Sequence, residues 1–174
     1  MTTSSTSTIR RRAARAAVTA PLVAVVVLPG GPAAAASGPA VCVSKVTVGL
    51  TPGLTFESTD FHYSSGGPTG TVFCVGSING HEITGPGTVE DIGAGTGGCN
   101  GGSISGANIY TLPTTGGTVT VRQPVEAQYA GPTGMRVKGT NTYPGGFGFA
   151  PTKGDCVAAP LTEVEVVIYG VMLG

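Results

Sequence analysis

From residue 41 onward, apolar side chains tend to recur at every second position rather than at the spacing of a helix. Such alternation is typical of strands that bury one face. Glycine and proline interrupt every stretch that could otherwise follow a helical period. Strands are predicted at about residues 41–50, 54–63, 71–78, 104–112, 117–129 and 161–173. The pattern therefore indicates an all-β chain.

Local signals divide these strands. Pro52-Gly53 fits a type II turn, and a change of phase along 54–63 predicts a bulge near Ser58. Asn79-Gly80 predicts a tight hairpin in which Ile78 pairs with His81, because both turn residues favour positive φ. Pro124 lacks an N–H and predicts an edge or bulged position.

The glycine-rich stretch 85–106 shows little alternation and is predicted to be a long loop, with one short strand near 88–92. About eight to ten strands with one apolar face each must bury those faces against one another. We expect an antiparallel β-sandwich, immunoglobulin-like or similar, with a partly closed β-barrel as the alternative. Residues 37–174 are expected to form this single domain.

The first 36 residues are typical of a secretory signal. A cluster of arginines precedes an apolar run over 16–28, and small residues lead to a cleavage site after Ala36. The apolar run is too short for a transmembrane helix, which needs about 20 residues. The sequence therefore predicts a secreted, extracellular protein without a transmembrane anchor.

Removal of the signal would change the net charge. Four of the nine basic residues leave with it, so five bases would face nine acids, a balance of −4. Nucleic acids and anionic membranes are bound through clustered lysine and arginine. We therefore expect no nucleic-acid partner, and an extracellular ligand or envelope component instead.

Four cysteines follow the signal, which in an oxidising compartment indicates two disulfides. Zinc sites need short paired spacings that are absent here. Three connectivities are possible, and we predict Cys42–Cys74 with Cys99–Cys156.

Candidate chemistry is sparse. His62, His81, Asp60 and Glu82 could bind a metal or serve an extracellular hydrolase if the sheet gathered them, but solvent-exposed strand and hairpin-end positions are the favoured explanation. Two carboxylate pairs have ordinary structural explanations. Glu163 and Glu165 fit the solvent-exposed face of a strand, and Glu90 and Asp91 fit a loop. We predict no catalytic residues and no cofactor.

Aromatic rings suggest a binding surface. Tyr143, Phe147 and Phe149 fall in a glycine-rich segment, predicted to be a loop, where alternation does not assure burial. Exposed together, these rings would form a ligand surface.

The arginine-containing leader, the alanine-rich cleavage region and the Gly/Thr/Val-rich body with four cysteines resemble small exported proteins of high-GC actinobacteria. The resemblance implies a secreted bacterial sandwich and no particular activity. The body is also similar to the enediyne-carrying apoproteins, small secreted immunoglobulin-like sandwiches with two disulfides, although no site residue carries over. We expect a non-enzymatic extracellular binding or cell-envelope module; the alternatives are a hydrolase or metal-dependent enzyme, and an inhibitor or small-molecule carrier.

Overall fold

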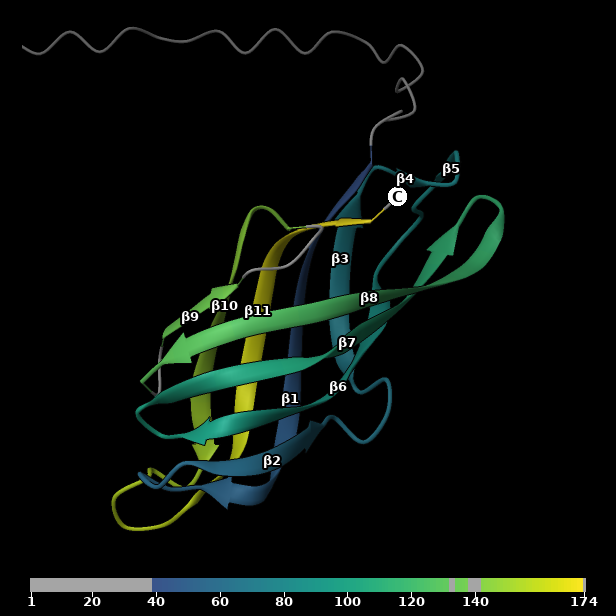
Figure 1. The fold of residues 1–174 in the computed structure, drawn as a ribbon. Coiled ribbons are helices and arrows are strands. Elements are labelled where there is room, and N and C mark those ends of the chain that lie inside the picture. The colour runs from purple at the N-terminus through teal and green to yellow at the C-terminus, as the bar shows by residue number, and fades with distance from the viewer. Residues whose placement is uncertain (1–38, 132–133, 138–141, 174) are drawn as a thin grey trace, which may run out of the picture. The chain divides into compact units, whose positions relative to one another are not determined.

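The chain is described by a computed structural model that covers residues 39–131, 134–137 and 142–173, with the backbone alone at 134–137, 142–145, 171 and 172. The predicted leader, residues 1–36, lies outside these ranges. Within them the regular structure consists of strands, shown in Figure 1. They are β1 (Ala40–Leu54), β2 (Thr59–Ser64), β3 (Gly70–Val75), β4 (Ser77–Ile78), β5 (His81–Glu82), β6 (Gly87–Gly98), β7 (Gly101–Thr114), β8 (Gly117–Ala130), β9 (Gly134–Val137), β10 (Thr142–Lys153) and β11 (Leu161–Leu173).

The first strand follows the predicted alternation. In β1 every even position from Ala40 to Leu50 is buried, and every odd position between them is exposed. One edge of β1 pairs with β11 from Ala40↔Leu173 to Leu54↔Leu161. The other edge is shared by β3, at residues 41–45, and β2, at residues 49–51. β1 therefore has strand partners along both edges, with β11 on one side and β2 and β3 on the other.

The sheet closes on itself. Both β2 and β3 pair with β6, and β7, β8, β9, β10 and β11 then follow in order until β11 meets β1. The all-β prediction is confirmed, and of the two predicted architectures the continuous ladder matches the barrel. A sandwich would keep two separate sheets, whereas here hydrogen-bonded pairing connects both walls. Within the described residues, the register between β9 and β10 is given by the pair Met135↔Phe147.

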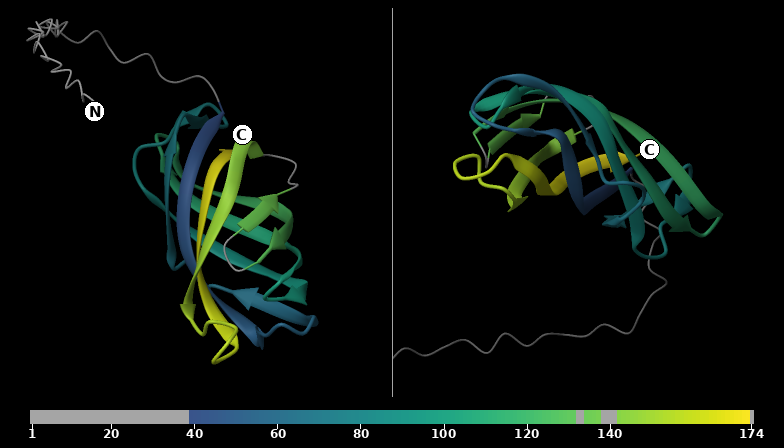
Figure 2. Two further views of the ribbon diagram at one scale, coloured as in Figure 1. Left: turned by 90° about the vertical axis from the view of Figure 1, so that its left-hand side faces the viewer. Right: turned by 90° about the horizontal axis from the view of Figure 1, so that it is seen from below.

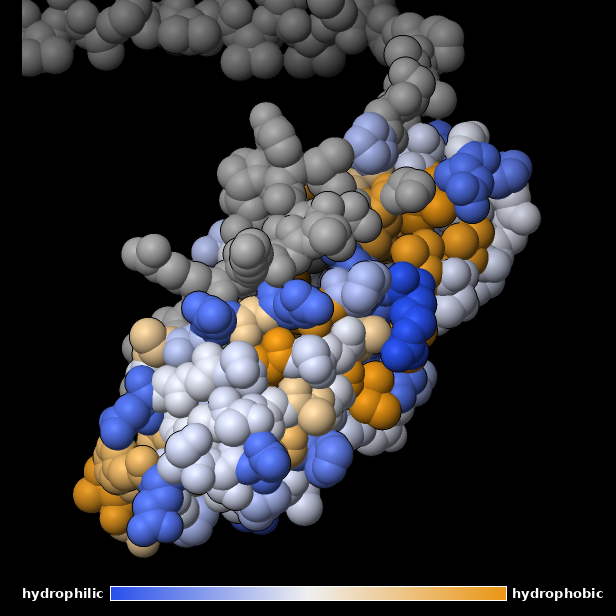
Figure 3. Space-filling view, viewed as in Figure 1, coloured by the Kyte–Doolittle hydropathy of each residue, from blue (hydrophilic) through white to orange (hydrophobic). Residues whose placement is uncertain are grey.

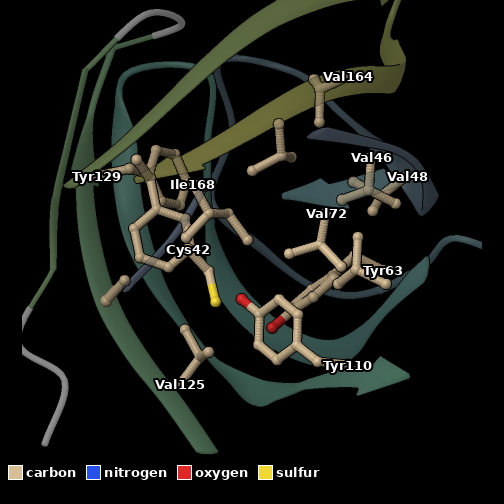
Figure 4. Close-up of a cluster of buried hydrophobic side chains, with 14 of the residues drawn as sticks. Cys42, Val46, Val48, Tyr63, Val72, Tyr110, Val125, Tyr129, Val164 and Ile168 are labelled. Atoms are coloured by element: carbon tan, nitrogen blue, oxygen red, sulfur yellow. The ribbon is translucent and has the colours of Figure 1, made fainter. Parts of the chain in front are cut away.

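The two walls of the barrel cross. β1, β10 and β11 run along one wall, and β6, β7 and β8 cross the other at a steep angle (Figures 1 and 2). The core fills the space between them, with Val46 and Ile168 on the first wall and Tyr110 and Val125 on the second. Figure 4 shows these side chains pointing into the shared interior. Among the described residues, no helix is long and apolar enough to cross a bilayer.

The predicted long loop at residues 85–106 is wrong. These residues form β6 and the first part of β7, paired from Thr88↔Thr111 to Gly98↔Gly101. The inward positions are glycines because rings from β2 occupy the space above them: a Cβ at Gly93 would overlap the Tyr63 ring, and one at Gly95 would lie 2.6 Å from Phe61 Cζ. Glycine carries no alternation signal, so the sequence pattern predicted only the short strand near 88–92 within β6 and missed the start of β7.

The predicted turn at Pro52-Gly53 is also wrong. β1 continues to Leu54, which pairs with Leu161, and the chain reverses over residues 55–58. Gly53 lies against the start of β11, where a Cβ would come within 2.7 Å of Thr162 Cγ2. Leu54 and Phe61 therefore share the interior from two different strands, and no bulge near Ser58 is needed.

Two local predictions are confirmed. Asn79 and Gly80 have φ values of 52° and 78°, and Ile78 pairs with His81 beside the turn. Pro124 pairs with Ala107 of β7, whereas the pairing of β8 with β9 is confined to residues 127–130. Within the described residues, Pro124 therefore has a strand partner on one side, as an edge position predicts.

The predicted disulfides are both confirmed. Cys42–Cys74 joins β1 to β3 at directly paired positions. Cys99–Cys156 joins the turn between β6 and β7 to the loop between β10 and β11. The second bond therefore connects the two walls at one end of the barrel.

Candidate functional site

A cluster of exposed apolar side chains lies on the outside of β1, β3 and β11. It is formed by residues exposed over 43% to 74% of their surface. We call it the apolar face; its members are Val41, Val43, Phe73, Val75 and Tyr169.

The register brings these residues together. Val41 pairs with Val75, and Val43 pairs with both Phe73 and Tyr169. Directly paired side chains on one side of a sheet lie about 5 Å apart, so the five groups are contiguous. The left view of Figure 2 shows β1 and β11 side by side on this wall.

The apolar face has a sharp boundary. Farther along β1 the outward residues become Lys45, Thr47 and Gly49. Lys45 Nζ lies 2.8 Å from Glu165 Oε2, an ion pair that marks the polar edge of the apolar face. The opposite wall looks different: β7 and β8 present a mainly pale and blue surface in Figure 3. Of the eight large apolar side chains that are exposed in the described part of the chain, five belong to the apolar face, and Phe56, Ile92 and Val157 lie elsewhere.

The sequence analysis missed the apolar face, although a signal for it exists. The segment Ala40–Val43 is apolar at both even and odd positions, unlike the alternation that follows. A strand that is apolar on both faces is normally covered on both. Only the register with β3 and β11 reveals that the outward groups form one patch.

The aromatic segment is not the exposed loop that was predicted. Phe147 and Phe149 belong to β10, where Phe147 is buried and Phe149 is half-buried. The Phe149 ring meets Tyr129 edge to face, with centroids 6.2 Å apart. Pairing with β11 turned these rings inward, because both Gly146 and Gly148 lie on the other side of β10. The side chain of Tyr143 lies outside the described residues.

The two histidines lie far apart. His62 points outward from β2, and His81 is exposed on β5; Figure 1 places these strands at opposite ends of the barrel. Asp60 accepts a hydrogen bond from Thr96 Oγ1 at 2.5 Å, and the backbone N–H of Glu82 donates to Thr115 Oγ1. Within the described ranges, no three His, Cys, Asp or Glu side chains are placed to share a metal ion.

A polar hollow of about 710 Å³ lies outside β2, β6, β7 and β8, and His62 and Ser105 both line it. His62 pairs with Ala94, which pairs with Ser105. Two strand spacings, about 10 Å, therefore separate the imidazole-bearing residue from the serine. A nucleophile and its base need hydrogen-bond contact, and this row does not bring them that close.

A second, mostly apolar hollow of about 60 Å³ lies inside the barrel. Asp91 lines it from β6, with Tyr63, Val125 and Phe147 among its neighbours there. Burial raises the pKa of Asp91 to about 7, although the backbone N–H of Ile92 acts in the opposite direction. Burial, and secondarily the charge of Asp91, raises the pKa of Tyr63. Asp91 was predicted to be a loop residue because its strand was missed.

Comparisons with protein-family models, with curated proteins and with solved structures found no match to this chain.

Proposed function

We propose that this protein is an exported, non-enzymatic binding module whose apolar face docks on an extracellular or cell-envelope partner. The observation that carries the proposal is the contiguity of five exposed apolar side chains across three paired strands. Soluble monomers carry single exposed apolar residues routinely, but a contiguous patch marks an interaction site. Two disulfides are compatible with an extracellular setting.

The free energy gained by burying the apolar face shows which further contacts the partner must make. Covering a half-exposed Val or Phe side chain contributes about 1 kcal/mol, so the apolar face supplies roughly 5 kcal/mol. Association alone costs about 4 kcal/mol or more. The partner therefore has to engage the polar edge as well, where Lys45 and Glu165 lie. Since the apolar groups stand on paired strands, little additional ordering opposes binding.

The other predicted functions have weaker support. A hydrolase or metal enzyme would need His62 or His81 beside suitable partners, and the described geometry separates them. A carrier of drug-sized molecules encloses its ligand in a pocket of about 300 Å³ or more. The interior hollow measures about 60 Å³, and the hollow of about 710 Å³ lies on the outer side of the sheet. The apolar face remains the best-supported site.

Photo-crosslinking in the producing cells tests the proposal. Phe73→p-benzoylphenylalanine places a photoreactive ring in the apolar face, and Phe56→p-benzoylphenylalanine is the matched control. Phe56 is also exposed, at 55% against 63% for Phe73, but it lies in the turn after β1. We expect a discrete adduct from position 73 that position 56 does not give.

A second variant checks that the adduct depends on the apolar face. Val43→Thr with Val75→Thr keeps the side-chain shape and strand propensity but weakens apolar contact. We expect it to reduce the adduct at position 73 by roughly tenfold, since about 1.4 kcal/mol changes occupancy by that factor. Equal adducts from positions 73 and 56, or an adduct insensitive to the double variant, would show that the apolar face is not the docking surface.

A further inference from the structure

Three buried polar side chains form a row on the inner side of one wall. Asp91 on β6 pairs with Asn108 on β7, which pairs with Gln123 on β8. Their exposed fractions are 5%, 1% and 5%, so all three point into the barrel. We call them the inner polar row. Inward-facing strand positions are usually apolar, so the inner polar row is an exception to the alternation of apolar and polar residues in this fold.

Acceptor atoms of the row have no protein partner. Asn108 Nδ2 donates to Tyr110 Oη at 3.2 Å. Asn108 Oδ1 and Gln123 Oε1 are buried without a hydrogen bond to any described residue, and so is Tyr63 Oη. Buried polar atoms are normally satisfied, and the exceptions often mark a site for water or a ligand.

The row is held rigidly in the wall. Asp91 donates its N–H to Ser65 Oγ at 3.1 Å and accepts from the Ser65 N–H at 2.9 Å. Asn108 is fixed by pairing on both sides. These contacts use backbone atoms of Asp91. Its carboxyl accepts a hydrogen bond from the backbone N–H of Ile92 and also lines the interior hollow.

Of the inner polar row, Asp91 lines the interior hollow, together with Tyr63 and Tyr129. The rest of its lining is largely apolar and comes from both walls, and none of the described lining residues is basic. It is partly open to solvent and has room for about four water-sized groups. A short apolar chain entering from the open side would place its tip beside the row.

We propose that this interior site binds an aminoalkyl group, a primary ammonium carried on a short apolar chain. An ammonium has three N–H donors. The polar groups that line the hollow are the Asp91 carboxylate and the hydroxyl oxygens of Tyr63 and Tyr129, and both hydroxyls are buried without a hydrogen bond to any described residue. The apolar lining suits the methylene groups of the chain, and the size of the hollow restricts it to a few carbons. The amine would be free or the end of a longer molecule.

Other small ligands fit less well. A carboxylate would face the charge of Asp91 without a basic residue in the described lining. An alcohol brings a single donor for several acceptors. The chemistry of the row therefore selects for a cation rich in hydrogen-bond donors.

Titration of the full secreted protein with n-propylamine, followed by NMR of the tyrosine rings, tests the site. Propanol and propionate are the matched ligands of equal size. The measurement is made at about pH 8, above the pKa of Asp91, so that the carboxyl is charged; Tyr63 and Tyr110 are the titratable groups beside it. We expect saturable shifts of the Tyr63 signals with the amine, and at least roughly tenfold weaker binding of both other ligands.

Variants separate binding from adventitious association. Asp91→Asn preserves size and removes the charge, and we expect it to weaken amine binding by roughly tenfold or more. Tyr129→Phe removes one hydroxyl acceptor from the lining and should weaken binding less. Asp60→Asn, on the outer side of β2, should leave binding unchanged. Equal amine affinity in wild type and folded Asp91→Asn, or no Tyr63 response at saturation, would overturn the proposal. Neither result would affect the apolar face, which lies on the outside of the barrel.

Discussion

Individual residues in this protein depart from the rule that apolar groups face inward and polar groups face outward. Asp91 is an ionisable side chain placed in the interior, with its pKa raised to about 7 by burial. Val41 and Phe73 are apolar and placed outside. A departure from this pattern carries a cost in stability, and such departures are commonly found at functional or strained sites.

Asp91 makes a testable contribution to the pH dependence of stability. Its folded pKa, about 7, exceeds the ordinary value of 3.8. Between these values the folded protein retains a proton that the unfolded chain releases, so the free energy of unfolding falls as pH rises through this window and levels off above about 7. Asp91→Asn removes this effect.

Urea unfolding of both proteins at about pH 5 and about pH 8 measures the difference. We expect Asp91→Asn to gain about 2 kcal/mol or more relative to wild type over this range. Asp60→Asn is the control and should track wild type. A constant difference between Asp91→Asn and wild type at both pH values would mean that Asp91 is charged and well solvated in the fold.

At the scale of elements, β6 and β7 show how a strand can form without an alternation signal of its own. Gly93 and Gly106 lie on facing strands at sites where a Cβ would overlap the Tyr63 ring. The Tyr63 side chain of β2, rather than a side chain of β6 or β7, fills the interior at these positions. The glycines are therefore a packing requirement and not a sign of a loop.

Alanine substitutions test this role of the glycines. Gly93→Ala should lower the free energy of unfolding by about 1–3 kcal/mol, because the added methyl group overpacks against Tyr63 and the backbone of Ser105. Gly148→Ala is the matched control: it lies in β10, and a Cβ there would have no atom within 4 Å. It should be neutral or slightly stabilising. Equal effects of the two substitutions in urea unfolding would contradict the packing account.

For the whole molecule, closure of the barrel depends on connections between distant segments. β1 and β11 come from opposite ends of the described chain, and Cys99–Cys156 connects the two walls. The Cys42–Cys74 bond instead joins strands that already pair. A disulfide between such distant segments restricts the conformations of the unfolded chain, and this restriction raises the stability of the folded domain.

Removal of the wall-to-wall disulfide should weaken the whole barrel. Cys99→Ala with Cys156→Ala is expected to lower the free energy of unfolding by about 3–4 kcal/mol on the chain-entropy account. It should also speed trypsin cleavage after Lys153, at the end of β10 beside the released loop. Wild-type protein and the Cys42→Ala/Cys74→Ala variant are the references. Cleavage of each protein is measured at a urea concentration the same distance below its own unfolding midpoint. Cleavage at the same rate in all three proteins would mean that Cys99–Cys156 does not hold this loop.

The sequence by itself determined much of this molecule. Alternation predicted β1, β8 and β11, and Asn79-Gly80 specified a hairpin. The even number of cysteines indicated two disulfides, and the predicted pairing, one of three that the sequence allows, is the one observed. These features depend on local backbone preference or on few possible pairings.

Only the tertiary structure decided the closure of the sheet, the identity of the apolar face and the inner polar row. Val43 meets Phe73 and Tyr169, and Asp91 meets Asn108, through pairing between strands far apart in the chain. Side-chain alternation states which residues share a face of one strand, but not which strand lies beside it. Register and closure supply that information, because they depend on how all the strands together bury their apolar surface.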